Sequence, residues 1–168
     1  MFPSRIDPRS AAEQRKRIEG NIPTSVLQRL SKAVSRLDKV EADLSFRRDE
    51  QGRYRVVGSL EAELQMQCQR CMQDYQVQIE APVDAVIVWS DEQARQTPAD
   101  LDPWVADEQM ELLGAVEDEL LLSLPAMPVH QLDECSVPAR YSSQAEEETA
   151  KKPFAELEVL KKSLETNT

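Results

Sequence analysis

The chain contains little cysteine, little glycine and no long apolar run, and each shortage excludes a class of protein. Its three cysteines are an odd number, and two of them are separated by only two residues, unlike the paired framework of a secreted disulfide protein. Its four glycines include no glycine-rich loop of the kind that cradles phosphates. The apolar stretch at 120–128 contains two prolines and is far shorter than the roughly 20 residues of a membrane span. We therefore expect a cytoplasmic protein without a membrane partner.

Positive charge is scarce overall but concentrated near the N-terminus. The 168 residues include 31 acidic and 20 basic side chains, which gives a net charge of −11 and an isoelectric point of about 4.6. Residues 1–36 hold eight basic and three acidic side chains, a charge of +5, so the remainder carries −16. The overall charge opposes nonspecific binding to nucleic acid, whereas the N-terminal segment suits RNA or an acidic partner. The candidate contact residues there are Arg5, Arg9, Arg15, Lys16 and Arg17.

Hydrophobic periodicity predicts a single α+β domain at 23–135. Apolar residues at helical spacing predict amphipathic helices near 24–37 and 110–124. Between them, the acidic, proline-containing segment 90–109 predicts a long surface loop. We expect an antiparallel sheet packed by the two helices, because this arrangement buries the apolar face of each element. Alternating apolar and polar residues predict its strands at 40–46, 56–68, 75–79 and 83–89.

The two ends of the chain predict less regular structure. Residues 1–22 are polar and basic without a sustained period, which predicts a flexible arm. Residues 136–168 form a polar tail that ends in a short amphipathic helix, with apolar residues three or four positions apart.

The three cysteines and the only histidine form two short pairs that match a structural zinc site. Cys68 and Cys71 flank the expected hairpin turn, and His130 and Cys135 follow the second expected helix. Three thiolates and one imidazole fit tetrahedral zinc, and four protein ligands leave no open position for catalysis. Two alternatives remain: compact thiols that only pack, and a redox pair at Cys68 and Cys71. A nucleophile–base pair of Cys135 and His130 lacks a recognisable third member.

Three further groups of residues are candidate partner surfaces: the arginines of one hairpin, an acidic stripe on the second helix and an apolar stripe in the tail. The hairpin near residue 50 combines guanidinium groups with the ring of Tyr54, which suits phosphates and a base, although a merely solvated turn explains the pattern as well. The hairpin residues are Arg47, Arg48, Arg53 and Arg55. The expected protein-partner residues are Glu117, Asp118 and Glu119 on the second helix, and Phe154, Leu157 and Leu160 in the tail.

The order of these motifs resembles the YceD family. The similarity rests on Cys-Gln-Arg-Cys at 68–71, on Val-Glu-Asp-Glu-Leu-Leu-Leu-Ser-Leu-Pro at 116–125, on Pro-Val-His at 128–130 followed by Cys135, and on Lys-Pro-Phe-Ala at 152–155. The resemblance implies a role in synthesis, processing or stability of 23S ribosomal RNA, and so in building the large ribosomal subunit. It brings no catalytic residues with it.

Charge and resemblance together predict an indirect, noncatalytic role. A strongly acidic protein binds RNA poorly as a whole, so an acidic face within 91–119 would contact a basic ribosomal protein or a processing nuclease. The basic arm and the arginine hairpin would then contact precursor RNA locally. The alternatives are an enzyme that acts directly on ribosomal RNA, and a zinc-dependent or redox-sensing regulator.

Overall fold

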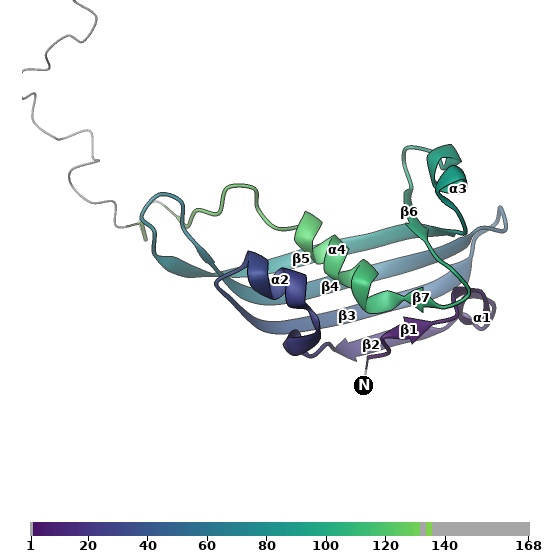
Figure 1. Cartoon of the computed structure of the whole chain (residues 1–168), viewed down its shortest axis with the longest axis horizontal. Coiled ribbons are helices and arrows are strands. Elements are labelled where there is room, and N and C mark those ends of the chain that lie inside the picture. The colour runs from purple at the N-terminus through teal and green to yellow at the C-terminus, as the bar shows by residue number, and fades with distance from the viewer. Residues whose placement is uncertain (1, 132–133, 136–168) are drawn as a thin grey trace, which may run out of the picture.

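A twisted five-stranded sheet forms the centre of the computed structural model, which describes residues 2–131, 134 and 135 (Figure 1). Strand order is β2-β3-β4-β5-β6; the first four are antiparallel neighbours, and β6 runs parallel to β5. The predicted α+β class with a mainly antiparallel sheet is therefore confirmed. The strands are β2 (Arg17–Asn21), β3 (Arg36–Arg48), β4 (Tyr54–Gln67), β5 (Asp74–Val88) and β6 (Asp102–Val105).

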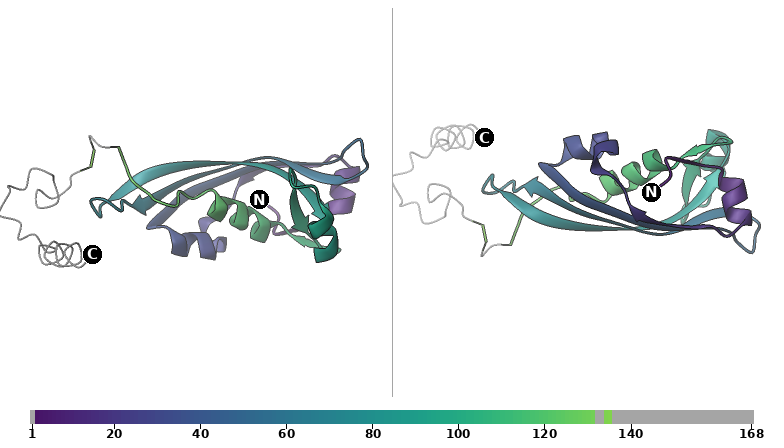
Figure 2. Two further views of the ribbon diagram at one scale, coloured as in Figure 1. Left: turned by 90° about the horizontal axis from the view of Figure 1, so that it is seen from above. Right: turned by 90° about the horizontal axis from the view of Figure 1, so that it is seen from below.

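The helices leave one face of the sheet uncovered. Figure 2 shows α2 and α4 along one face, whereas no helix of the described part covers the other. The remaining small sheet pairs β1 with β7. Among the described residues, no helix has the length and apolar character needed to span a membrane. The other elements are β1 (Arg5–Ile6), α1 (Pro8–Glu13), η1 (Thr24–Val26), α2 (Gln28–Ala33), α3 (Asp91–Gln96), β7 (Met110–Glu111) and α4 (Leu112–Leu122).

The core lies between the sheet and its helices. Because side chains alternate between the faces of a strand, each long strand turns every second residue inward. Leu44, Leu60 and Leu64 are fully buried on the inner face, and Leu30 and Leu120 meet them from α2 and α4. This apolar face is the main source of stability, at roughly 25 cal/mol per Å² of buried apolar surface.

The prediction of a loose arm is wrong for residues 2–22. Asp7 caps α1 by accepting hydrogen bonds from the backbone N–H groups of Arg9 and Ser10, and Pro8 occupies the first helical position. β2 then pairs with β3, and Ile18 is buried. The Asp-Pro pair is a helix-start signal in the sequence, but six residues are too few for a visible period.

The predicted helix at 24–37 is also wrong in its extent. The segment forms η1 and α2, and β3 already begins at Arg36. The backbone N–H of Ser35 donates to the carbonyl of Gln65, and Leu37 pairs with Leu64. The apolar spacing of this segment suits either a helix or a strand, and long-range pairing with β4 makes its end a strand. The predicted helix at 110–124 corresponds to α4.

Two further segments are more regular than expected. Residues 75–88 belong to one continuous strand, β5, which runs through Pro82. Proline has no N–H to donate, but β6 pairs only with Ala85–Val88, so the edge of β5 beside Pro82 is unpaired and tolerates it. The segment 90–109 is not a long loop, since it contains α3 and β6. Ser90 accepts a hydrogen bond from the N–H of Gln93 and begins α3. The predicted tail helix lies outside the described residues.

Candidate metal centre

The Cys-x-x-Cys motif occupies the tight turn between β4 and β5, as predicted. The N–H of Cys68 donates to the carbonyl of Gln73 over 2.8 Å, and the N–H of Met72 donates to the carbonyl of Cys68 over 2.8 Å. Gln69 donates its N–H to the carbonyl of Pro128 over 2.9 Å, which holds the chain beyond α4 against the turn. A redox motif uses a helix N-terminus to activate its thiol, whereas Cys68 here directly follows strand β4.

The structure brings the two predicted pairs together. One ligand atom from each of Cys68, Cys71, His130 and Cys135 lies within 4.8 Å of all the others. The sulfurs of Cys68 and Cys135 are 4.0 Å apart, and Nε2 of His130 is 3.8 Å from the sulfur of Cys71. A tetrahedral zinc ion with Zn–S bonds of about 2.3 Å requires S–S separations of about 3.8 Å and S–N separations of about 3.6 Å. The geometry therefore fits zinc without large movement.

The surroundings of the four ligands are consistent with a closed site. Cys68 is fully buried, and the other three ligands are partly buried. The ring of Tyr75 lies 5.2 Å from that of His130, centroid to centroid. Nε2 of His130 is 2.8 Å from the carbonyl oxygen of Glu134, and Nδ1 is buried without a hydrogen-bond partner among the described residues. Because a carbonyl oxygen can only accept, Nε2 carries the hydrogen in this contact, and binding of a metal through Nε2 requires the other tautomer, with the hydrogen on Nδ1.

The thiols have unequal proton affinities. Burial raises the pKa of Cys68, but nearby backbone N–H groups, including that of Arg70 at 3.4 Å from the sulfur, outweigh burial and lower the pKa to about 6. Burial, followed by the adjacent sulfurs of Cys71 and Cys68, raises the pKa of Cys135. Three thiolates this close together repel one another unless a cation lies between them. The donor set thus suits a bound Zn²⁺ ion.

Met72 occupies a position in the turn that favours glycine. Its φ is 64°, in the left-handed region that costs a residue with a side chain about 1–2 kcal/mol, and its side chain is 63% exposed. We expect Met72→Gly to raise the free energy of unfolding by about 0.5–1 kcal/mol, after the entropy that glycine loses on folding. Gln69→Gly, in the same turn without a positive φ, should lower it. Urea melts of both variants test this, and a lower stability for Met72→Gly would contradict it.

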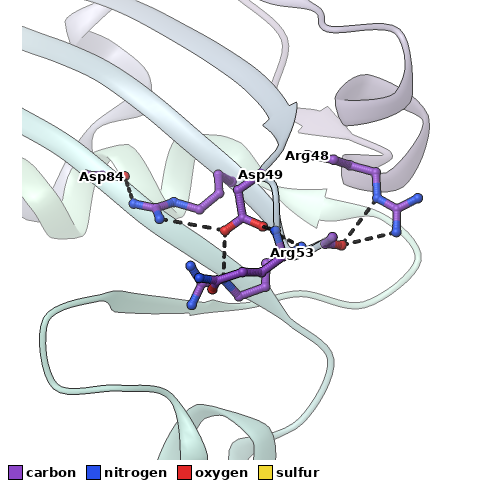
Figure 3. Close-up of polar contacts among 7 residues, drawn as sticks. Arg48, Asp49, Arg53 and Asp84 are labelled. Atoms are coloured by element: carbon purple, nitrogen blue, oxygen red, sulfur yellow. Dashed lines mark hydrogen bonds and ion pairs between the residues drawn. The ribbon is translucent and has the colours of Figure 1, made fainter.

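Acidic residues neutralise two of the four arginines of the predicted hairpin, Arg53 and Arg55. Arg53 donates from its backbone and its side chain to Asp49, over 2.9 and 2.7 Å (Figure 3). Arg55 forms ion pairs with Asp84 and Asp49 and is only partly exposed. Arg48 donates instead to the carbonyl of Gly52, as Figure 3 also shows.

The basic residues of the N-terminal segment are spread along the fold. Arg5 pairs with Glu111, and Arg17 pairs with Asp43. Arg9 lies over the ring of Trp89. The structure therefore does not gather these side chains into one basic arm. Arg15, Lys16 and Arg47 are exposed.

The three acidic residues expected to form a partner face on α4 do not form one exposed surface. Glu117 is buried and faces α2, so it is unavailable to a partner. Glu119 accepts a hydrogen bond from the indole N–H of Trp104 over 2.8 Å. Asp118 is exposed and pairs with Arg29. Phe154, Leu157 and Leu160 lie outside the described residues.

A different acidic surface lies on the uncovered face of the sheet. Glu41 of β3 is directly opposite Glu61 of β4, which is directly opposite Glu80 of β5. We call these three residues the glutamate row. A hollow of about 410 Å³ lies over the row and is also lined by Glu63 and Lys39. The sequence shows acidic residues on alternate positions of each strand, but only the strand register places them side by side.

The chain is similar to known proteins over most of its length. The family model described as "Large ribosomal RNA subunit accumulation protein YceD" matches residues 56–161, which include all four ligands. The chain belongs to the YceD family. A YceD relative from Haemophilus influenzae (strain ATCC 51907 / DSM 11121 / KW20 / Rd), named large ribosomal RNA subunit accumulation protein, is 33% identical over 167 residues, which cover 95% of this chain and 96% of the relative. No solved structure matches the chain.

Proposed function

We propose that this YceD protein is a noncatalytic cytoplasmic factor that supports the synthesis, processing or stability of 23S ribosomal RNA during assembly of the large ribosomal subunit. Membership of the family and the name of the Haemophilus relative support a role in accumulation of this RNA. The family is named for accumulation rather than for a reaction. The protein binds large-subunit assembly intermediates, with a basic protein component as its main contact.

The glutamate row is the observation that carries this proposal. Like charges directly opposite each other destabilise a sheet, so the row lowers stability unless something else compensates. Of the three glutamates in the row, only Glu41 has an ion pair within the described residues, to Lys39 over 2.7 Å. A lysine- or arginine-rich protein surface would supply the missing charges, whereas RNA phosphates would be repelled. The open face is therefore suited to a basic ribosomal protein or to a basic processing nuclease.

The metal centre has a supporting role in this proposal. Cys68, Cys71, His130 and Cys135 would hold one structural Zn²⁺ ion, which links the β4–β5 turn to the segment after α4. A bound zinc ion supplies cross-linking of these segments, because four protein ligands fill its coordination shell. The chain's own turn positions two thiolates, and Pro128 positions the segment that carries the other two ligands.

Neutralising the glutamate row should weaken association with large-subunit precursors. We expect Glu41→Gln, Glu61→Gln and Glu80→Gln together to weaken cosedimentation about tenfold, because exposed ion pairs contribute roughly 0.2–1 kcal/mol each. The matched control carries Glu13→Gln, Glu50→Gln and Asp74→Asn, three exposed acids outside both the row and residues 91–119. The control should sediment like the unaltered protein. Equal weakening in both variants would show that total charge matters and the row does not.

A further inference from the structure

A pocket at the hairpin end of the sheet is used by neither the metal centre nor the glutamate row. It has a volume of about 540 Å³ and lies between β5, α3 and the chain that follows α3. Its walls are mainly apolar, with Val86, Val88 and Leu101 among them, and Gln96 adds an amide. This volume is within the range of about 300–1,000 Å³ typical of small-molecule sites.

Two aromatic rings form the part of the pocket nearest the hairpin. The centroids of Tyr54 and Trp89 are 5.3 Å apart, and their planes are tilted by 39°. Both residues are only partly buried, and both line the pocket. Flat aromatic surfaces that remain accessible can stack against a nucleobase, at about 1–3 kcal/mol per base.

Positive charge surrounds the same rings. The guanidinium carbon of Arg9 lies 4.7 Å from the centroid of Trp89, and that of Arg48 lies 4.9 Å from the centroid of Tyr54. Neither arginine forms an ion pair with another described residue, so both retain an uncompensated charge. Arg53 also lines the pocket, although Asp49 compensates much of its charge. The site therefore joins stacking surface with phosphate-binding groups in a protein that is otherwise acidic.

The pocket unites residues that are distant in the sequence. Arg9 comes from α1, Arg53 precedes β4, and Trp89 follows β5. Arg48, at the end of β3, does not line the pocket and reaches it only through its contact with the ring of Tyr54. An arginine stacked on an aromatic ring next to an apolar cleft is typical of surfaces that bind single-stranded nucleic acid. A double helix keeps its bases stacked internally and cannot present one to such a cleft.

We infer that the pocket bounded by Tyr54, Trp89 and α3 binds an unpaired nucleotide of single-stranded RNA, with its base on the aromatic rings and its phosphates near Arg9 and Arg48. This inference rests on the proposed function, since it names an RNA contact for the same assembly factor. The acidic remainder of the surface confines RNA to this end of the sheet.

Tryptophan fluorescence titrations with a ten-nucleotide oligoadenylate RNA test the inference. Trp89 should be quenched on binding, whereas Trp104 is buried and hydrogen-bonded to Glu119 and should not respond. Trp89→Phe keeps a ring, so it should bind within about threefold of the unaltered protein while losing the quenching signal. By anisotropy of labelled RNA, Trp89→Ala should bind about 5- to 150-fold more weakly, as expected for the loss of about 1–3 kcal/mol from one stacking partner.

The charged groups have their own test. Arg9→Gln should weaken binding and reduce the slope of log affinity against log salt by about 0.7, the value for one phosphate contact on a single strand. Arg36→Gln makes the same change of charge at the far end of the sheet, where Arg36 pairs with Asp38, and should leave both quantities unchanged. Because Arg9 is exposed, this variant remains informative if Trp89→Ala fails to fold.

Several results would overturn the inference. Equal RNA affinity for Trp89→Phe, Trp89→Ala and the unaltered protein would remove the stacking site, as would the absence of any quenching by the RNA. Tight binding of free AMP would identify a small-nucleotide pocket, and equal binding of duplex RNA would exclude an unpaired base. Cosedimentation that depends on the glutamate row, combined with no oligonucleotide binding, would overturn this inference and leave the proposed function intact.

Discussion

Cys71→Ser is expected to remove bound zinc and to lower the free energy of unfolding by about 4 kcal/mol, when free zinc is about a thousand times its Kd for the unaltered protein. The expectation follows from the four ligand atoms that lie within 4.8 Å of one another. Serine cannot replace a thiolate as a soft ligand, so the remaining three ligands bind zinc much more weakly.

The loss should be confined to one end of the molecule at first. The proposed zinc site would join the β4–β5 turn to Pro128, His130 and Cys135, whereas the main core lies under α2 and α4. Hydrogen exchange should therefore speed up at the N–H of Gln69, which donates to the carbonyl of Pro128. The buried strands should keep their protection until global unfolding.

Metal analysis of protein purified without a histidine tag, with thermal melts in the presence and absence of a chelator, checks this prediction. Gln69→Ser changes a neighbouring exposed residue of the same turn and should keep about one zinc ion per chain, the number that a single four-ligand site holds. If the unaltered protein contained no zinc and melted like Cys71→Ser, the cysteines would be packing residues only.

Glu117→Ala is expected to lower the free energy of unfolding by about 3 kcal/mol, because it removes several charge-assisted hydrogen bonds at once. Glu117 accepts from the backbone N–H groups of Arg29 and Leu30, over 2.7 and 3.0 Å, and from the Arg29 side chain over 2.8 Å. α2 has no side-chain cap of its own, so this carboxylate from α4 satisfies its free N–H groups.

A comparison with the neighbouring acid Asp118 makes the Glu117 prediction specific. Asp118→Ala removes the other acid that pairs with Arg29, but Asp118 is 59% exposed, so the loss should stay below about 1 kcal/mol. Chemical denaturation of both variants at neutral pH measures the difference. Equal losses would show that Glu117 does not cap α2.

Acidification should reduce the contribution of Glu117. Burial raises its pKa, but the hydrogen bonds from Leu30 and Arg29 outweigh burial and hold the pKa below its usual value. The carboxylate therefore stabilises the fold fully above the unfolded pKa of about 4.3, and this stability is lost as pH falls through the lower folded pKa. The difference between the unaltered protein and Glu117→Ala should shrink over that acidic range.

The sequence predicts the strands and the Cys/His cluster better than the helices. Long alternation identifies β4, and two short Cys/His pairs identify the residues that the structure brings together, because both signals are local. The helix over 24–37 was mispredicted because its apolar spacing is compatible with either a helix or a paired strand, and pairing of β3 with β4 decides between them. Asp7 and Ser90 cap α1 and α3 and are visible in the sequence as helix-start signals, although both helices are too short to show a hydrophobic period.

The acidic surfaces could not be placed without the structure. Glu117 has the position of a solvent-facing helix residue in the sequence, and its partners are 87 and 88 residues away. The glutamate row depends on strand register, since a shift by one residue would turn the side chains to the other face. The Tyr54–Trp89 pocket likewise depends on the pairing of Tyr54 with Ile87, which brings the hairpin beside the end of β5.

The central claim, that this protein supports large-subunit ribosomal RNA by binding and not by catalysis, is tested most directly by titrating purified protein into large-subunit precursor particles. Sedimentation measures the protein bound, and analysis of the RNA ends and bases measures any reaction. The claim predicts saturable, equimolar binding that leaves the RNA unchanged. Cleavage or modification of the RNA by protein present at far less than one copy per particle would contradict it.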